Sequence, residues 1–322
     1  MLPTLFIDGQ EGTTGLRIRE MLAERDDLEL LLISDEERKD PTARAAFLNR
    51  ADVAILCLPD DAAAEAVGLI ENPETRVIDT STARRVAPGW VYGLPEVSRQ
   101  QKEAIRGAGR IANCGCYPVG YILAVRPLVE AGLIQPQALL TVNAASGYSG
   151  GGRRMIEAYQ AAAAEASGGN GDAALGFSSY SLAGGHKHLP EMAAYSRVEQ
   201  PPLFIPSVVH TYCGMLVAIP LTRPQLARDV DCEAIVDIWE KYYADAPFVQ
   251  PLRSATALRD GRFLDIEGCN GTNRVELSAF GKPESGITLI GRLDNLGKGA
   301  SGNAVQCLNL MLDRDEQTGL RR

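Results

Sequence analysis

The first hundred residues alternate short apolar runs with helical patterns, and this alternation constrains the fold more than any other feature. The predicted strands lie at residues 4–7, 28–33, 52–58 and 77–78, and the predicted helices at 13–24, from 41 onward and at 61–70. Nearly continuous apolar strands that alternate with helices are typical of a parallel sheet covered on both faces. The sequence therefore predicts a doubly wound α/β domain here.

The pattern changes after about residue 112, where longer apolar stretches are separated by glycine-rich loops. Strands are predicted at 138–145, 208–220 and 274–279, which favours a mixed or antiparallel sheet in a second domain. Residues 168–171 are predicted to form a flexible loop. A last helix is predicted over 301–312, with one apolar stripe made of Ala304, Val305, Leu308 and Leu312.

Composition narrows the classes of function. The 322 residues include 32 basic and 41 acidic side chains, and the net charge of −9 argues against a nucleic-acid or anionic-membrane partner. The N-terminus reaches Asp8 without a basic region, so no secretory signal is expected. Seven scattered cysteines are simplest to interpret as reduced thiols, which predicts a cytoplasmic protein. With only three histidines, no metal site is expected.

A glycine turn connects the first predicted strand to the first helix. Gly9, Gly12 and Gly15 allow a tight turn in which backbone N–H groups approach a pyrophosphate at the start of a helix. Thr13 and Thr14 add hydroxyl donors. The position of the turn between a strand and a helix favours a nucleotide-binding site over a turn with no ligand.

The end of the second predicted strand is where a dinucleotide-binding domain recognises the adenosine ribose. Asp35 in this segment would accept from a ribose 2′-hydroxyl, which favours NAD. Ser34, Arg38 and Lys39 would instead hold a 2′-phosphate, which favours NADP. The residues alone leave both cofactors open.

Two thiols lie just before a helix predicted from about residue 119 to 131. A cysteine at this position meets unpaired N–H groups and the positive end of the helix dipole, which favour the thiolate that a nucleophile needs. Cys114 and Cys116 are both in this segment. Cys57 lies within an apolar strand and is interpreted as a small core residue, like the four other cysteines.

Two further segments carry polar groups suited to catalysis. His186 and His188 share a predicted polar loop with Glu191, and such a group can move protons. His210, within a strand-like stretch, is interpreted as structural. A glycine-rich segment that begins with Ser146 and Gly147 ends a strand and opens a helix, so it is either a turn that holds an anionic substrate or a flexible loop.

Taken together, these segments resemble the N-acetyl-γ-glutamyl-phosphate reductase family, in its shorter bacterial form. The resemblance spans nearly the whole chain and includes the glycine turn and four further motifs. These are Gly93–Glu96, Asn113–Pro118, His186–Glu191 and Asn295–Gln306. One departure is Cys114, which stands where the family has proline.

The resemblance implies a role for each candidate residue. Cys116 would be the nucleophile and His186 the acid/base, accompanied by Glu191. The cofactor, implied to be NADPH, would be held by Gly9, Gly12, Thr13, Thr14, Gly15, Ser34, Arg38, Lys39, Gly297 and Lys298. The substrate would contact Asn113, Ser146, Gly147, His188 and one of Arg84 or Arg85, whose guanidinium suits the phosphate.

The resemblance also implies the architecture and the reaction. Residues 1–115 would form a Rossmann-type dinucleotide-binding domain completed by the C-terminal segment 297–322. Residues 116–296 would form an α+β catalytic and oligomerisation domain of a homodimer or homotetramer. The implied reaction, in arginine biosynthesis, reduces N-acetylglutamyl 5-phosphate to its semialdehyde through a Cys116 thioester.

Two alternative functions remain. The first is aspartate-semialdehyde dehydrogenase or a related acyl-phosphate reductase, which uses the same chemistry on another substrate. The complete histidine run at 186–191 speaks against it. The second is a dinucleotide-binding regulator without catalysis, which would need the glycine turn but no reactive thiol.

Overall fold

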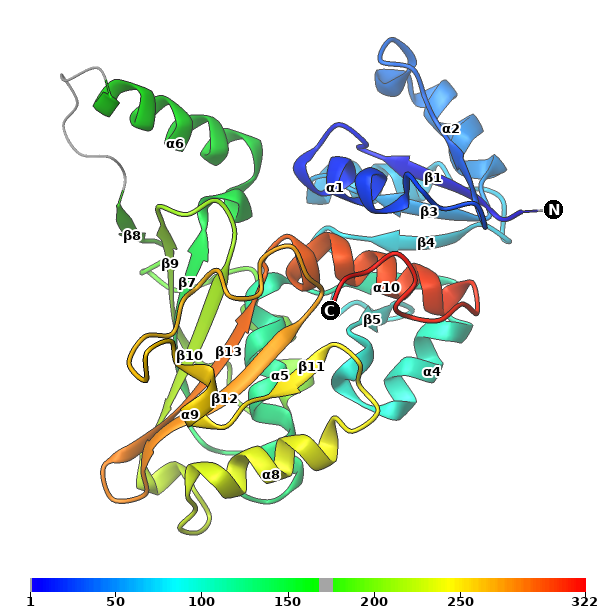
Figure 1. Ribbon diagram of the computed structural model, residues 1–322. Coiled ribbons are helices and arrows are strands. Elements are labelled where there is room, and N and C mark those ends of the chain that lie inside the picture. Colours follow the sequence, from blue (N-terminus) through cyan, green and yellow to red (C-terminus); the bar gives the residue numbers. More distant parts are fainter. Residues whose placement is uncertain (1, 168–175) are drawn as a thin grey trace. The chain divides into compact units, whose positions relative to one another are not determined.

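The computed structural model describes residues 2–167 and 176–322, which divide into two compact units (Figure 1). Unit 1 comprises Met1–Cys114 together with Ala300–Leu320, and unit 2 comprises Gly115–Gly299 with Arg321–Arg322. The loop predicted at 168–171 lies outside the described residues. Unit 1 is therefore built from both ends of the chain.

Unit 1 contains a six-stranded sheet in which every strand pair is parallel, with the order β2-β1-β3-β4-β6-β5. The strands are β1 (Thr4–Asp8), β2 (Glu29–Leu31), β3 (Val53–Leu56), β4 (Arg76–Asp79), β5 (Val91–Gly93) and β6 (Arg110–Asn113). This order and direction confirm the predicted doubly wound domain. The second strand ends at Leu31, two residues earlier than predicted.

Helices cover both faces of this sheet, because side chains on successive strand residues point to opposite faces. The helices are α1 (Thr13–Leu22), α2 (Pro41–Arg50), α3 (Asp60–Gly68), α4 (Arg99–Gly107) and α10 (Gly302–Met311). Leu5 and Ile7 of β1 pack with α1, α4 and α10, whereas Phe6 packs with α2 and α3. Each face thus has its own buried core.

The last helix, α10, differs from the prediction of a single apolar stripe. Every residue from Gly302 to Met311 is buried. The helix packs against the sheet and against α1 and α4, which together surround it. A single apolar stripe is typical of a helix that has one side exposed to solvent, whereas all sides of α10 are buried.

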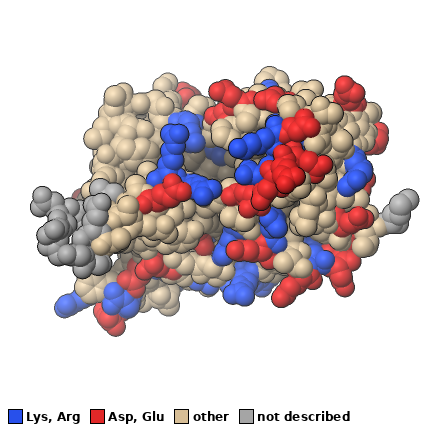
Figure 2. Space-filling view, turned by 90° about the horizontal axis from the view of Figure 1, so that it is seen from above, with Lys and Arg blue, Asp and Glu red and all other residues tan. Residues whose placement is uncertain are grey.

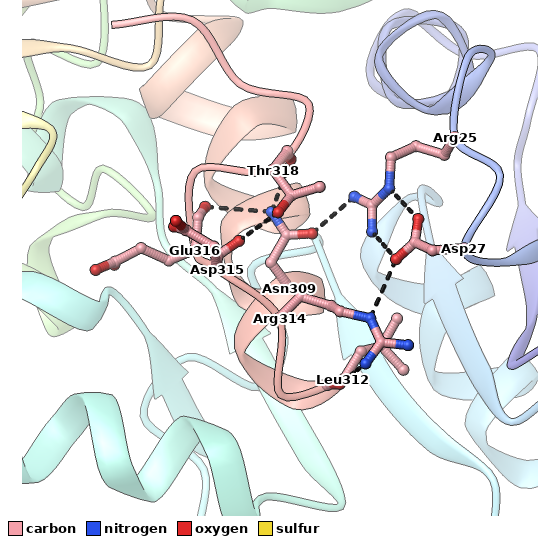
Figure 3. Close-up of polar contacts among 8 residues, drawn as sticks. All are labelled: Arg25, Asp27, Asn309, Leu312, Arg314, Asp315, Glu316 and Thr318. Carbon is pink, nitrogen blue, oxygen red and sulfur yellow. Dashed lines mark hydrogen bonds and ion pairs between the residues drawn. The ribbon is translucent and has the colours of Figure 1, made fainter.

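The segment after α10 is held to unit 1 by a polar network (Figure 3). Arg25 donates to the side-chain oxygen of Asn309 at 2.8 Å, and it also holds the carboxylate of Asp27. Arg314 donates to the same carboxylate at 3.2 Å. The amide of Asn309 donates to the backbone oxygen atoms of Glu316 and Thr318. The chain end is therefore fixed to the segment that connects α1 with β2.

Unit 2 contains a mixed sheet of seven strands in the order β11-β12-β13-β10-β7-β9-β8. The strands are β7 (Thr141–Gly147), β8 (Phe177–Ser179), β9 (Leu203–Val209), β10 (Met215–Leu221), β11 (Val249–Pro251), β12 (Val275–Lys282) and β13 (Gly286–Leu293). The single strand predicted at 208–220 is wrong. Gly214 has a φ of +112°, and the turn around it separates β9 from β10.

One face of this sheet is covered by helices. The helices of unit 2 are α5 (Cys116–Glu130), α6 (Gly152–Ser167), α7 (Leu189–Ser196), α8 (Cys232–Tyr242) and α9 (Ser254–Ala257). Helix α5 packs on β10, β12 and β13, and all its residues from Tyr117 to Val129 are buried. A Cβ atom on Gly291 would meet the Cα of Gly120 at 2.8 Å, so the absence of side chains lets helix and strand approach closely.

Charged side chains of both signs cover the surface. On the face shown in Figure 2, basic and acidic side chains lie next to one another. At α8, Arg253 forms ion pairs with Glu233, Asp237 and Glu240. Within the described residues, no helix is both long enough and apolar enough to span a bilayer.

Candidate active site

The glycine turn of unit 1 is formed by close backbone approaches. Gly9 has a φ of +87°, and a Cβ atom there would overlap the backbone oxygen of Cys57 at the end of β3. A Cβ atom on Gly15 would overlap the backbone oxygen of Gly9. The N–H of Gly12 donates to that same oxygen at 3.0 Å. Only glycine fits at positions 9 and 15. The absence of side chains there lets the turn pack tightly against the end of β3 just before α1 begins.

This turn fits the pyrophosphate of a dinucleotide. Helix α1 begins at Thr13 after Gly12, and no side chain caps its first N–H groups. No acidic side chain lies in its first turn to repel a phosphate. The side chains of Thr13 and Thr14 lie at the same helix end, as the predicted hydroxyl donors require.

The segment after β2 carries the residues predicted to recognise the ribose. The hydroxyl of Ser34 donates to the carboxylate of Glu37 at 2.7 Å. Arg38 forms an ion pair with Asp35 at 2.9 Å, and both side chains are largely exposed. Lys39 is also exposed. Serine and arginine are thus each bound to an acidic neighbour, which an incoming phosphate would have to displace.

The predicted phosphate-binding residues of unit 1 have different surroundings. Arg85 is buried and donates to the backbone oxygen of Asn113 at 2.9 Å. The amide of Asn113 donates to the backbone oxygen of Ala300 and accepts from Asn303 at 2.7 Å. Arg84 lies over the ring of Trp90, 5.8 Å from its centroid, and its Nε is buried without a hydrogen bond. Arg85 and Asn113 are therefore engaged in hydrogen bonds that hold the backbone, whereas the Nε of Arg84 makes none.

Cys116 is the first residue of α5, so the helix starts three residues earlier than predicted. Pro118 is tolerated there, because the N–H that proline lacks is not needed in the first turn of a helix. Gly115 precedes Cys116 as the N-cap residue, and no side chain caps the helix. Cys116 is partly accessible, whereas Cys114 is buried. The positive end of the helix dipole therefore lies at the accessible thiol.

Two contacts fix the backbone around Cys116. The N–H of Gly115 donates to Oε2 of Glu191 at 3.0 Å, and this carboxylate is buried at the start of α7. A Cβ atom on Gly299 would lie only 2.7 Å from the Cβ of Cys116. Gly299 belongs to a π-helix at Gly297–Ser301, a form that often occurs at functional sites. Glu191 thus holds the backbone just before Cys116, and only glycine at position 299 leaves room for the Cys116 side chain.

The histidine run lies in the loop before α7, as predicted. His186 and His188 are both buried, and α7 begins at the residue after His188. The ring of His186 makes edge contacts with Tyr117 and Phe204, at centroid distances of 5.8 and 5.0 Å. The aromatic packing that buries the ring also fixes its orientation, which a proton donor requires.

Other predicted residues lie in the framework of unit 2. The hydroxyl of Ser146 donates to the backbone oxygen of Gly147 at 3.0 Å, at the end of β7. Gly147 lies so close to the turn at Tyr212 that a Cβ would be 2.6 Å from its backbone oxygen. Lys298 is fully buried, with its Nζ 6.0 Å from the ring centroid of Phe248. Gly297 is equally enclosed, beside Thr272 and Asp294.

Desolvation makes two of the other thiols, those of Cys57 and Cys269, harder to ionise. Desolvation raises the pKa of Cys57 to about 12 and that of Cys269 to about 11. Both therefore stay protonated near neutral pH and are poor nucleophiles. His210 lies beyond the end of β9, where its ring is 5.8 Å from that of Tyr159.

Some residues of this site carried no signal in the sequence. Tyr180 lies just after β8, and its hydroxyl is within hydrogen-bond distance of the His186 ring. Tyr180 precedes His186 by six residues and belongs to no motif. Ser207 accepts from Tyr117 through its backbone oxygen, which any residue type supplies. The close contact between Gly299 and the Cys116 side chain is indicated in the sequence only by the position of Gly299 in a glycine-rich stretch.

Comparison with known proteins defines the class first. Residues 6–105 match the family model described as semialdehyde dehydrogenase, NAD binding domain, and residues 116–295 match semialdehyde dehydrogenase, dimerisation domain. The fold is shared with aspartate semialdehyde dehydrogenase II of Vibrio cholerae, with a TM-score of 0.75, 19% identity and coverage of 97% of this chain and 99% of that one. The chain is thus a semialdehyde dehydrogenase in both sequence and fold.

Curated relatives narrow the class to one family. N-acetyl-γ-glutamyl-phosphate reductase 2 of Nostoc sp. is 48% identical over 99% of both chains. The enzyme named N-acetyl-γ-glutamyl-phosphate reductase in Chelativorans sp. is 47% identical over 97% of this chain and 99% of its own. This chain belongs to the N-acetyl-γ-glutamyl-phosphate reductase family, as the sequence motifs predicted.

Proposed function

We propose that this protein reduces N-acetyl-L-glutamyl 5-phosphate to N-acetyl-L-glutamate 5-semialdehyde and phosphate, with NADPH, as a step of arginine biosynthesis. The observation that carries the proposal is the partly accessible Cys116 at the uncapped start of α5. A thiolate in that position suits an acyl phosphate, because phosphate is a good leaving group and a thioester is readily reduced. The names of the relatives supply the identity of the acyl group.

In the first step, the Cys116 thiolate attacks the acyl carbon. A carbon–sulfur bond forms, the bond from carbon to the phosphate oxygen breaks, and phosphate leaves. The N–H groups at the start of α5 stabilise the thiolate before the attack. Glu191 and Gly299 keep the sulfur in place through the Gly115 N–H and the Cys116 Cβ.

In the second step, the thioester is reduced. NADPH, when bound, supplies a hydride to the thioester carbon. His186 donates a proton to the oxygen on which negative charge develops, and takes it back from that oxygen as the carbon–sulfur bond breaks and the aldehyde C=O forms. The semialdehyde is released and the Cys116 thiolate is restored. The buried, packed ring of His186 supports this role.

The preference for NADPH rests on Arg38, Lys39 and Ser34. A 2′-phosphate would take Arg38 from Asp35 and the Ser34 hydroxyl from Glu37, exchanging exposed contacts for charge-assisted ones. Replacing both Arg38 and Lys39 by alanine is expected to raise KM for NADPH about tenfold or more and leave KM for NADH within about twofold. Equal kcat/KM for the two cofactors in the unmodified protein would contradict the preference.

Arg84 is the better candidate for the substrate phosphate. Its guanidinium lies over Trp90 and its Nε has no hydrogen bond, whereas Arg85 and Asn113 hold the backbone at the end of β6. Arg84→Ala is expected to raise KM for the acyl phosphate, and Arg85→Ala to lower stability. A normal KM in the Arg84 variant would exclude this role.

One assay separates the proposed function from its alternatives. The protein is given NADP, phosphate and either N-acetylglutamate semialdehyde or aspartate semialdehyde, and the formation of NADPH is followed. Phosphate-dependent oxidation of the acetylated substrate alone supports the proposal. Preference for aspartate semialdehyde would identify the other acyl-phosphate reductase, and no turnover of either would favour a regulator.

We also propose that unit 2 pairs with a second copy of this chain, as a homodimer or a dimer of dimers. One face of its sheet carries apolar side chains and no covering helix among the described residues. Leu203 and Ile205 of β9 are exposed there, in register with Thr141 and Asn143 of β7. The matched description of residues 116–295 as a dimerisation domain supports this. Light scattering is expected to show a dimer or tetramer, and Ile205→Glu to shift it toward monomer.

A cytoplasmic location completes the proposal. A thiolate nucleophile stays reduced in a compartment that keeps thiols reduced, which the cytoplasm does. Fractionation is expected to place the protein there.

A further inference from the structure

Four groups next to the nucleophile form one continuous series of hydrogen bonds. The Nε2 of His186 lies 3.4 Å from the hydroxyl of Tyr180. The Tyr180 hydroxyl donates to that of Tyr117 at 3.3 Å, and Tyr117 donates to the backbone oxygen of Ser207 at 3.2 Å. The series starts at the proposed proton donor and ends on β9.

The end at Ser207 sets the direction of the whole series. A carbonyl oxygen only accepts, so the hydrogen of Tyr117 points toward it. Tyr117 therefore receives the hydrogen of Tyr180, and Tyr180 presents a lone pair to His186.

The other end gives the same direction independently. The backbone N–H of His188 donates to Nδ1 of His186 at 3.1 Å. In the neutral ring, an Nδ1 that accepts leaves the hydrogen on Nε2. Nε2 then donates to the lone pair of Tyr180. Both ends therefore select the same tautomer of His186.

Burial keeps the two phenols in the form that this arrangement needs. Desolvation raises the pKa of Tyr180 to about 12, and it raises the pKa of Tyr117 as well. Both hydroxyls thus retain their hydrogens near neutral pH. The negative charge of Cys116 contributes to both shifts, which indicates that the nucleophile lies near the two tyrosines.

We propose that Tyr180 is a positioning residue: held by Tyr117 and the Ser207 backbone, its hydroxyl presents a lone pair to Nε2–H of His186 and so fixes the orientation of that ring. The inference rests on the proposed function for its catalytic meaning, since it assigns the proton of His186 to Nε2. Tyr180 itself transfers no proton in this scheme. Losing it leaves Nε2–H without its acceptor, so that only ring packing and the His188 N–H hold the ring.

The test measures the tautomer directly, independently of turnover. The chain has only three histidines, so ¹⁵N-histidine labelling gives a simple spectrum in which His186→Asn identifies the His186 signals. Correlations between ring nitrogens and carbon-bound hydrogens then distinguish Nδ1–H from Nε2–H. Tyr180→Phe and Tyr117→Phe are compared with the unmodified protein. Tyr242→Phe, which removes a phenol hydroxyl from the end of α8, is the matched control.

The expected result is a single Nε2–H tautomer in the unmodified protein and in the Tyr242 control. In Tyr180→Phe, we expect the ¹⁵N signal of Nε2 to shift, because its hydrogen loses the acceptor while Nδ1 still accepts from the His188 N–H. We expect kcat to be about tenfold lower and KM to stay within about twofold, as for the loss of one hydrogen bond. An unchanged His186 spectrum in Tyr180→Phe would overturn the inference, whatever happens to kcat. If the unmodified protein shows the tautomer but no reductase activity, the proposed function fails and the positioning by Tyr180 remains.

Discussion

The glycine turn of unit 1 and the cysteine–histidine cluster of unit 2 are built in opposite ways. The turn consists of backbone atoms, and its glycines contribute by having no side chain. The cluster consists of side chains whose positions are fixed by packing and hydrogen bonds. A backbone site is therefore broken by adding atoms, and a side-chain site by removing them.

The largest effect is expected from Cys116→Ser in the side-chain site. A serine hydroxyl is barely ionised near neutral pH, so turnover is expected to fall at least about 10³-fold. The acyl-enzyme seen by mass spectrometry with the acyl phosphate is expected to disappear. Cys114→Ala is the matched control, because Cys114 is two residues away and buried. This variant should keep turnover and the yield of acyl-enzyme within a few-fold of the unmodified protein. An adduct trapped on Cys114 would refute the assignment.

His186→Asn is expected to lower kcat by about 10²–10⁴-fold, the usual range for the loss of a general acid. Steady-state kinetics and circular dichroism would separate this loss from misfolding. His188→Asn should have a smaller effect, since its backbone N–H, which holds His186, is retained. A larger loss of kcat in the His188 variant would reverse the two roles.

Gly9→Ala tests the backbone site by adding one methyl group. The new Cβ would overlap the backbone oxygen of Cys57 in a residue with φ of +87°. We expect the affinity for NADPH to fall about tenfold or more, or unit 1 to lose stability by about 1–3 kcal/mol, as typical for backbone strain. Fluorescence titration and thermal unfolding measure the two effects. Gly107→Ala, where a Cβ would meet nothing, is the control.

The smallest effect is expected at Asp27, outside both sites. The hydrogen bond from Arg25 holds the pKa of Asp27 at about 2, below its ordinary 3.8. Because the folded-state pKa is the lower one, this stabilisation is complete above about pH 4 and is lost as the pH falls toward 2. Asp27→Asn should cost about 1 kcal/mol in urea unfolding at neutral pH and nothing near pH 2. Asp35→Asn, in an exposed pair, should cost nothing at either pH.

The contrast between the two sites also explains what could be predicted from the sequence. The glycine turn and the thiol before α5 follow from local residue types, and Gly9 and Cys116 have the backbone surroundings that those types imply. The parallel direction of the strands of unit 1 and the helices on both faces follow from the alternation of strands and helices. The start of α5 was misplaced because Pro118 resembles a helix boundary when it is in fact inside the first turn.

The partners of His186 were not predictable in this way. Tyr180 reaches His186 because β8 pairs with β9 in a particular register, Ser179 opposite Ser207. Tyr117 comes from α5, more than sixty residues away from Tyr180. Register and long-range packing depend on the whole fold, and no local pattern records them.

The construction of unit 1 from both chain ends has a consequence for synthesis. The apolar side of its sheet beneath α1 and α4 is completed by Val305 and Leu308 of α10, close to the last residue. On the ribosome, that side of the nascent sheet stays open until α10 has been made, while most of unit 2, which precedes α10, is already available to fold. A premature stop shortly before α10 would release unit 1 with this apolar face exposed, a form that chaperones and proteases recognise.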